Sequence, residues 1–237
     1  MEYKYTGIVL SKKDIGETDR IYTIYTREAG KIKALGKSVR NPKSKLAGNL
    51  EPLTQVEFFV ARTRGLGKIT GVIAINNYPH IKNNTELLEA VSETFSILTS
   101  ITSEQQKDET VFNLLGEFLE VLENLPDRKS LEKIAIIKIG FLFKLLAELG
   151  YQTEADKCSA CGKKLQPEKN YFSIENGGVV CSNCGKNGML LILPISIKLL
   201  RIFPKNSLKN LGKIKVNPEN IQELETILQN LFQWIRK

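Results

Sequence analysis

Four cysteines form two matching pairs in the second half of the chain, and they are all the cysteines that it contains. The pairs are Cys158-Ser159-Ala160-Cys161 and Cys181-Ser182-Asn183-Cys184, with 19 residues between them and a glycine after each. This spacing is typical of a structural zinc site, because Zn²⁺ prefers four tetrahedral thiolates where no position stays open for catalysis. We therefore expect one structural Zn²⁺ per chain, bound by a zinc ribbon through Cys158, Cys161, Cys181 and Cys184.

Other chemistries fit these residues less well. A redox dithiol needs one cysteine pair, and a zinc deaminase needs a His-x-Glu upstream of a Pro-Cys-x-x-Cys. The only histidine, His80, is followed by Ile81 and Lys82, and no cysteine pair follows a proline. Gly36-Lys37-Ser38 resembles the end of a phosphate-binding loop, but five residues, and not four, separate it from Gly30. No catalytic set emerges, so we expect a protein that is not an enzyme.

Basic residues gather in two stretches of the first half. Residues 31–45 and 62–68 contain no acidic residue, and two such loops beside strands of a small barrel suit a phosphate backbone. The alternatives are a charged face that serves solubility, or a surface for an anionic protein or membrane. The predicted DNA-binding residues are Lys31, Lys33, Lys37, Arg40, Lys43, Lys45, Arg62, Arg64 and Lys68.

Charge is distributed unevenly over the 237 residues. Residues 1–80 have 14 Lys and Arg against 7 Asp and Glu, residues 81–157 have 8 against 14, and residues 158–237 have 12 against 5. The composition, 42% hydrophobic and 25% charged, is that of a globular protein. The longest apolar stretch, 134–149, contains three charged residues, and the N-terminus lacks a targeting pattern. We expect a cytoplasmic protein without a membrane span.

Strand-forming residues, in places alternating between polar and apolar, predict short strands in the N-terminal part of the chain. The predicted strands are residues 6–10, 20–26, 31–35, 55–61 and 68–75. Five strands within 80 residues favour a small closed barrel. An OB-fold is the first prediction, and an SH3-like barrel is the competing one.

The later residues follow a helical period. Helices are expected at about 85–102, capped by Thr85, at 109–125, and at 131–149, capped by Ser130 and ended by Gly150. The third is apolar nearly all round and should be buried, while 193–203 and 218–235 are further helices. The predicted fold class is α+β, with an OB-fold at 1–80, a helical bundle at 81–157, the zinc ribbon at 158–190 and C-terminal helices at 191–237.

These features, in this order, resemble the bacterial RecO family of recombination mediators over essentially the whole chain. The matching fragments begin with Thr6-Gly7-Ile8-Val9-Leu10, Gly16-Glu17-Thr18-Asp19-Arg20-Ile21, and Gly36 followed by 40–46 and Leu50-Glu51-Pro52. Residues 146–151, Tyr171-Phe172-Ser173 and Gly177-Gly178-Val179-Val180-Cys181 complete the pattern. Each fragment alone is weak, but their order and spacing together are specific.

The resemblance implies an OB-fold, a helical domain and an embedded zinc ribbon. It also implies binding of single- and double-stranded DNA, annealing of complementary strands, and help in loading RecA onto strands coated by single-strand-binding protein (SSB). The implied partners are RecR, in some members RecF, the acidic C-terminal tail of SSB, and RecA indirectly, at the nucleoid. Arg128, Lys133 and Lys138 are candidates for the tail contact. The alternative function is an assembly factor that binds structured RNA or an acidic protein.

Overall fold

The computed structural model describes residues 1–41, 43–44, 46–62, 65–126, 130–167, 169–186 and 188–236. They form two compact units, Met1–Leu119 and Glu120–Lys237, each with its own core. Lys45, Arg64 and Arg128 lie outside the described residues. The division of the sequence into four domains stays a prediction about independently folding parts.

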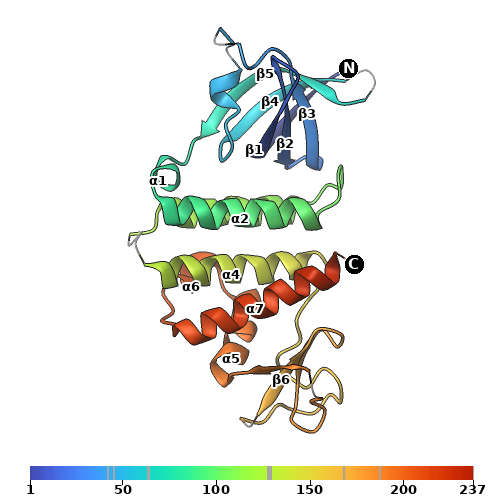
Figure 1. Ribbon diagram of the computed structural model, residues 1–237, viewed down its shortest axis with the longest axis vertical. Helices are drawn as coiled ribbons and strands as arrows, with labels where there is room; N and C mark the ends of the chain where they lie inside the picture. Colours follow the sequence, from blue (N-terminus) through green and yellow to red (C-terminus); the bar gives the residue numbers. More distant parts are fainter. Residues whose placement is uncertain are drawn as a thin grey trace. The chain divides into compact units, whose positions relative to one another are not determined.

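The first unit begins with a closed five-stranded barrel (Figure 1). Its strand order is β1-β2-β3-β5-β4, and β4 pairs back onto β1. This is OB-fold topology, so the first prediction is confirmed over the SH3-like alternative. The strands are β1 (Glu2–Ile15), β2 (Asp19–Thr26), β3 (Gly30–Gly36), β4 (Gln55–Ala61) and β5 (Gly67–Asn76).

Strand β1 is much longer than the predicted 6–10, and its length closes the barrel. Its first half pairs with β4 and its second half with β2, with a register shift between Val9 and Ser11. Strict alternation orients β4, so that Val56, Phe58 and Val60 are buried while the intervening residues are half-exposed. At the other side, β3 and β5 pair in parallel through Ala34↔Gly67 and Leu35↔Lys68.

Two helices complete most of the first unit. They are α1 (Pro79–Lys82) and α2 (Thr85–Ile101). A further helix, α3 (Glu109–Glu123), begins in the first unit and ends in the second. The cap of α2 is Asn84 and not the predicted Thr85, because the Asn84 carboxamide oxygen accepts the Leu87 N–H at 2.8 Å. The segment after α2 lies along β3, where the Gln105 N–H donates to the Lys31 carbonyl.

The second unit is built on α4 (Leu131–Glu148), which is buried along most of its length, as predicted. Ser130 caps it and Gly150 follows it with a φ of +90°, so both predicted ends are confirmed. Around it lie α5 (Pro194–Ile202), α6 (Leu208–Leu211) and α7 (Pro218–Ile235). Gly140 lets α6 approach α4, because a Cβ there would come within 2.3 Å of Leu211.

A small three-stranded sheet forms the rest of this unit (Figure 1). Its strands are β6 (Asn170–Ser173), β7 (Gly178–Val180) and β8 (Leu190–Ile192), in the antiparallel order β7-β6-β8. Two single 3₁₀ turns, η1 (Ala47–Asn49) and η2 (Phe203–Lys205), complete the elements of the described residues. Among those residues, no helix combines the length and apolarity needed to cross a bilayer.

Candidate metal centre and nucleic-acid interface

The four cysteines converge, and their sulfur atoms all lie within 4.8 Å of one another. Each pair closes a tight turn, in which the Gly162 N–H donates to the Cys158 carbonyl and the Gly185 N–H to the Cys181 carbonyl. The Cys161 and Cys181 sulfurs are 3.9 Å apart. A tetrahedral Zn²⁺ site with Zn–S bonds of about 2.3 Å has sulfur–sulfur edges of about 3.8 Å. The cluster could therefore hold a metal ion of this size.

The electrostatics of the cluster also suit a cation. Burial would raise the pKa of the Cys158 thiol, but backbone N–H groups of Cys181, Cys161 and Ala160 outweigh it and lower that pKa to about 6. Conversely, hydrogen bonds with the sulfurs of Cys161 and Cys181 raise the pKa of Cys184 to about 12. Neighbouring thiolates repel one another, and a divalent cation among them would stabilise their ionised form.

Neighbouring residues hold these turns in place. Gly185 lies against the Tyr171 ring, where a Cβ would come within 2.3 Å. The Arg201 guanidinium on α5 donates to the Ala155 carbonyl at 2.7 Å, just before the first cysteine, and also pairs with Asp156. The ribbon is thus tied to the helices of its own unit by side chains outside the cysteine pattern.

The predicted DNA-binding residues do not all reach one surface. Lys37, Arg40 and Lys43 are exposed on the loop after β3, and Arg62 and Lys68 are exposed at the adjoining β4–β5 hairpin. Lys68 pairs with Leu35 on one side and Ala61 on the other, so it lies between the two stretches. We call Lys37, Arg40, Lys43, Arg62 and Lys68 the basic rim.

Lys31 has a different role. Its side chain is buried, and its ammonium donates to the carbonyls of Thr99 and Thr102 at the end of α2. Desolvation lowers its pKa, while the nearby Glu104 opposes that effect. A cation favours the negative end of a helix, so Lys31 fastens β3 to α2 and has no free ammonium for phosphate. The structure thus places Lys31 away from the exposed residues of the basic rim.

Lys33 is exposed, yet it also faces the segment after α2. Its ammonium lies 2.5 Å from the Glu104 carboxylate. Exposed pairs of this kind contribute little to stability, and a phosphate could compete for the lysine. We do not include Lys33 in the basic rim, because its partner Glu104 lies in the segment after α2, next to the helix end that Lys31 contacts.

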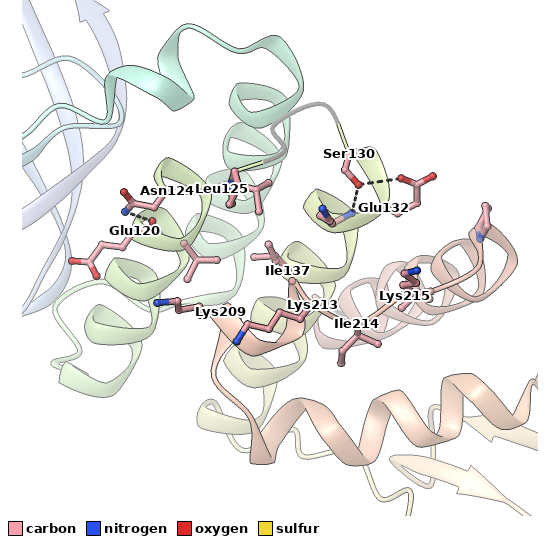
Figure 2. Close-up of a pocket in the computed structure, with 16 residues that line it drawn as sticks. Glu120, Asn124, Leu125, Ser130, Glu132, Ile137, Lys209, Lys213, Ile214 and Lys215 are labelled. Carbon is pink, nitrogen blue, oxygen red and sulfur yellow. Dashed lines mark hydrogen bonds between the residues drawn. The ribbon is translucent and has the colours of Figure 1, made fainter.

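A cavity of about 880 Å³ opens in the second unit, a feature that sequence reasoning did not identify (Figure 2). Its walls come from the end of α3, the start of α4 and the segment from α6 to α7. Apolar side chains from these segments include Leu125, Ile137 and Ile214. Four lysines and two glutamates add charge: Lys133, Lys209, Lys213, Lys215, Glu120 and Glu132.

Of the three residues predicted to contact the SSB tail, only Lys133 is found among the described residues that line the cavity. Lys133 lines it, whereas Lys138 lies 3.2 Å from Glu225 on α7. Arg128 lies outside the described residues. The sequence carries one signal that could have located this site, the Lys213-Ile214-Lys215-Val216 alternation before α7.

An OB-fold barrel with a basic rim, followed by a helical unit with a tetracysteine cluster, defines an α+β protein of the OB-fold class. Residues 1–78 match the family described as "Recombination protein O N terminal", and residues 90–234 match "Recombination protein O C terminal". The chain belongs to the recombination protein O family.

Curated relatives agree over nearly their full length, and each is named "DNA repair protein RecO". One from Dehalococcoides mccartyi (strain CBDB1) is 34% identical over 99% of this chain and 90% of the relative. One from Bacillus pumilus (strain SAFR-032) is 29% identical over 98% and 88%. One from Caldicellulosiruptor saccharolyticus is 30% identical over 98% and 92%.

Proposed function

We propose that this protein is a DNA-binding recombination mediator that works in the cytoplasm at the nucleoid. It anneals complementary single strands and helps RecA to load onto single-stranded DNA coated by SSB. The observation that carries this proposal is the basic rim on an OB-fold in a member of this family. RecR, and RecF where it takes part, are its proposed partners, and its role requires no bond chemistry by the chain itself.

The mechanism follows from charge. Lysine and arginine side chains of the rim neutralise phosphates of single- or double-stranded DNA and release counterions. Repulsion between two complementary strands falls when both are held at such a surface, and base pairing then selects the partner strand. Because the contacts go to the backbone, sequence preference should be weak.

We propose Zn²⁺ as the ion of the tetracysteine cluster, one per chain. Four thiolates and no histidine or water-accepting position suit a structural ion and not a catalytic one. The ion would hold Cys158, Cys161, Cys181 and Cys184 together, and its role is to fold the ribbon.

We place the acidic C-terminal tail of SSB in the cavity of the second unit. Its lysines outnumber its glutamates by four to two, and apolar side chains also line it. An acidic segment with apolar side chains complements both properties. Binding of the tail here would bring the mediator to SSB-coated single strands, and RecA loading would be helped indirectly.

The annealing of two complementary oligonucleotides precoated with SSB tests the proposed function. We expect this protein to accelerate annealing, measured by fluorescence quenching, and the acceleration to fade as salt rises. Single-stranded DNA, duplex DNA and structured RNA are compared for binding in parallel. If neither DNA form binds while structured RNA or an acidic protein does, the assembly-factor alternative replaces this proposal.

Charge reversal tests the cavity separately. Lys213→Glu with Lys215→Glu should weaken binding of a fluorescein-labelled SSB tail peptide about tenfold or more, since attraction becomes repulsion. Fluorescence anisotropy measures this, and the matched control is Lys107→Glu with Lys198→Glu, two exposed lysines outside the cavity. Equal losses in both double variants would remove the cavity from the peptide contact.

A further inference from the structure

Two acidic residues lie beside the basic rim, Asp14 next to Arg40 and Asp19 next to the loop that carries Lys37. Asp19 begins β2, directly after the β1–β2 turn, and belongs to the stretch Gly16-Glu17-Thr18-Asp19-Arg20. Its pKa is lowered mainly by the hydrogen bond from the Ser38 N–H and, to a smaller extent, by the Thr18 hydroxyl and the positive charges of Lys37 and Lys68. An acid so close to two rim lysines should repel phosphate, and the proposed mechanism does not use it.

The carboxylate of Asp19 is engaged with the backbone of the next loop. Its Oδ1 accepts the Ser38 N–H at 2.7 Å and the Thr18 hydroxyl at 3.0 Å. Ser38 has a φ of +56°, the left-handed region that costs free energy for residues with a Cβ. The hydrogen bond from its N–H to Asp19 therefore stabilises a turn that the backbone alone would disfavour.

The same β1–β2 turn also holds the other end of that loop. The Arg40 N–H donates to the Thr18 carbonyl at 3.0 Å, and the Arg40 guanidinium donates to the Gly16 carbonyl at 3.1 Å. Asp14 on β1 lies 3.4 Å from the same guanidinium. Between Ser38 and Arg40, Val39 is 1% exposed and packs in the barrel core. The loop is thus fastened on both sides of a buried anchor.

We propose that Asp19 is a positioning residue for DNA binding, which fixes the loop after β3 so that Lys37 is presented to phosphate in one conformation. This rests on the proposed function. A lysine on an ordered turn loses less conformational freedom on binding than one on a mobile loop, so preorganisation adds affinity without a new contact. That gain has to exceed the repulsion between the Asp19 carboxylate and phosphate.

Two substitutions separate positioning from simple charge. Asp19→Asn removes the charge but keeps the acceptor oxygen, whereas Asp19→Ala removes both. If Asp19 only shields the lysines, both variants should bind DNA more tightly and to a similar extent. If it positions the loop, only Asp19→Ala should weaken DNA binding, although the two variants have the same net charge.

The experiment measures binding of a labelled single-stranded oligonucleotide across a salt series. We expect Asp19→Asn to bind at least as tightly as the unaltered protein with the same slope of log K against log salt. We expect Asp19→Ala to bind about fivefold more weakly, with a shallower slope, because a disordered Lys37 releases fewer counterions. If the Asp19→Ala variant binds DNA as tightly as the Asp19→Asn variant, the proposal is overturned.

Two further arms keep the result interpretable. If Asp19→Ala does not fold, Ser38→Gly is compared with Ser38→Gly plus Asp19→Ala, because glycine adopts the left-handed conformation at little cost. Positioning requires the double variant to bind more weakly than Ser38→Gly, and equal or tighter binding overturns it. Lys37→Glu tests the proposed function itself: if it leaves DNA binding unchanged, the proposal that the basic rim binds DNA is wrong. If Lys37→Glu weakens binding and Asp19→Ala does not, only the role of Asp19 fails.

Discussion

Replacement of Cys158 by serine should abolish metal binding and unfold the ribbon. Cys158 is 1% exposed, and its sulfur accepts the Cys181 N–H at 3.3 Å, so it lies at the centre of the cluster. The apparent free energy of zinc binding by small zinc domains is about 10–16 kcal/mol, and most of it is folding free energy. We expect zinc content, measured by atomic emission after dialysis, to fall from one ion per chain to none.

A matched control lies in the second cysteine turn. Ser182→Ala changes an exposed residue between Cys181 and Cys184 and should keep both the ion and the unfolding temperature. DNA binding offers a second contrast, because the barrel has its own core in the first unit. Cys158→Ser should therefore change DNA affinity by less than about twofold. Unaltered protein that is purified without zinc and loses no stability on chelation would contradict the structural site.

Much of this arrangement could be predicted from local pattern. The local patterns are the Cys-x-x-Cys spacing, the alternation in Gln55–Ala61 and the apolar residues on nearly all sides of 131–148, and each depends on residues close in sequence. The α2 cap differs by one position, because Asn84 and Thr85 are both suitable caps and only the backbone shows which side chain reaches Leu87. The extra length of β1 depends on two partner strands, which its own residues do not specify.

The candidate site was harder to predict, because the charge pattern of a sequence does not show which charged side chains are buried. Lys31 and Lys37 look alike in the sequence, yet Lys31 donates to carbonyls 68 and 71 residues away while Lys37 is exposed. The cavity likewise joins three segments that are separated in the chain. Long-range packing decides these cases, and a single sequence records it only indirectly.

The second large effect concerns the rim itself. Lys37→Glu with Lys68→Glu should weaken binding of single-stranded DNA at least about tenfold, whatever its sequence. Both residues are exposed, and Lys68 pairs with Leu35, two residues before Lys37, so they lie at the ends of neighbouring strands. Loss of two phosphate contacts should lower the slope of log K against log salt by about 1.4 for single strands.

These two lysines are preferable to Arg40 for this purpose. The Arg40 guanidinium is bound to the Gly16 carbonyl and to Asp14, so its replacement would disturb the loop as well as remove a charge. The control, Lys107→Glu with Lys198→Glu, changes net charge by the same amount at exposed positions outside the rim. It should lower affinity only slightly, because neither lysine belongs to the rim and salt at 0.1 M screens the long-range effect of net charge. A control that loses as much affinity and slope as the rim variant would mean that total charge, and not this surface, binds DNA.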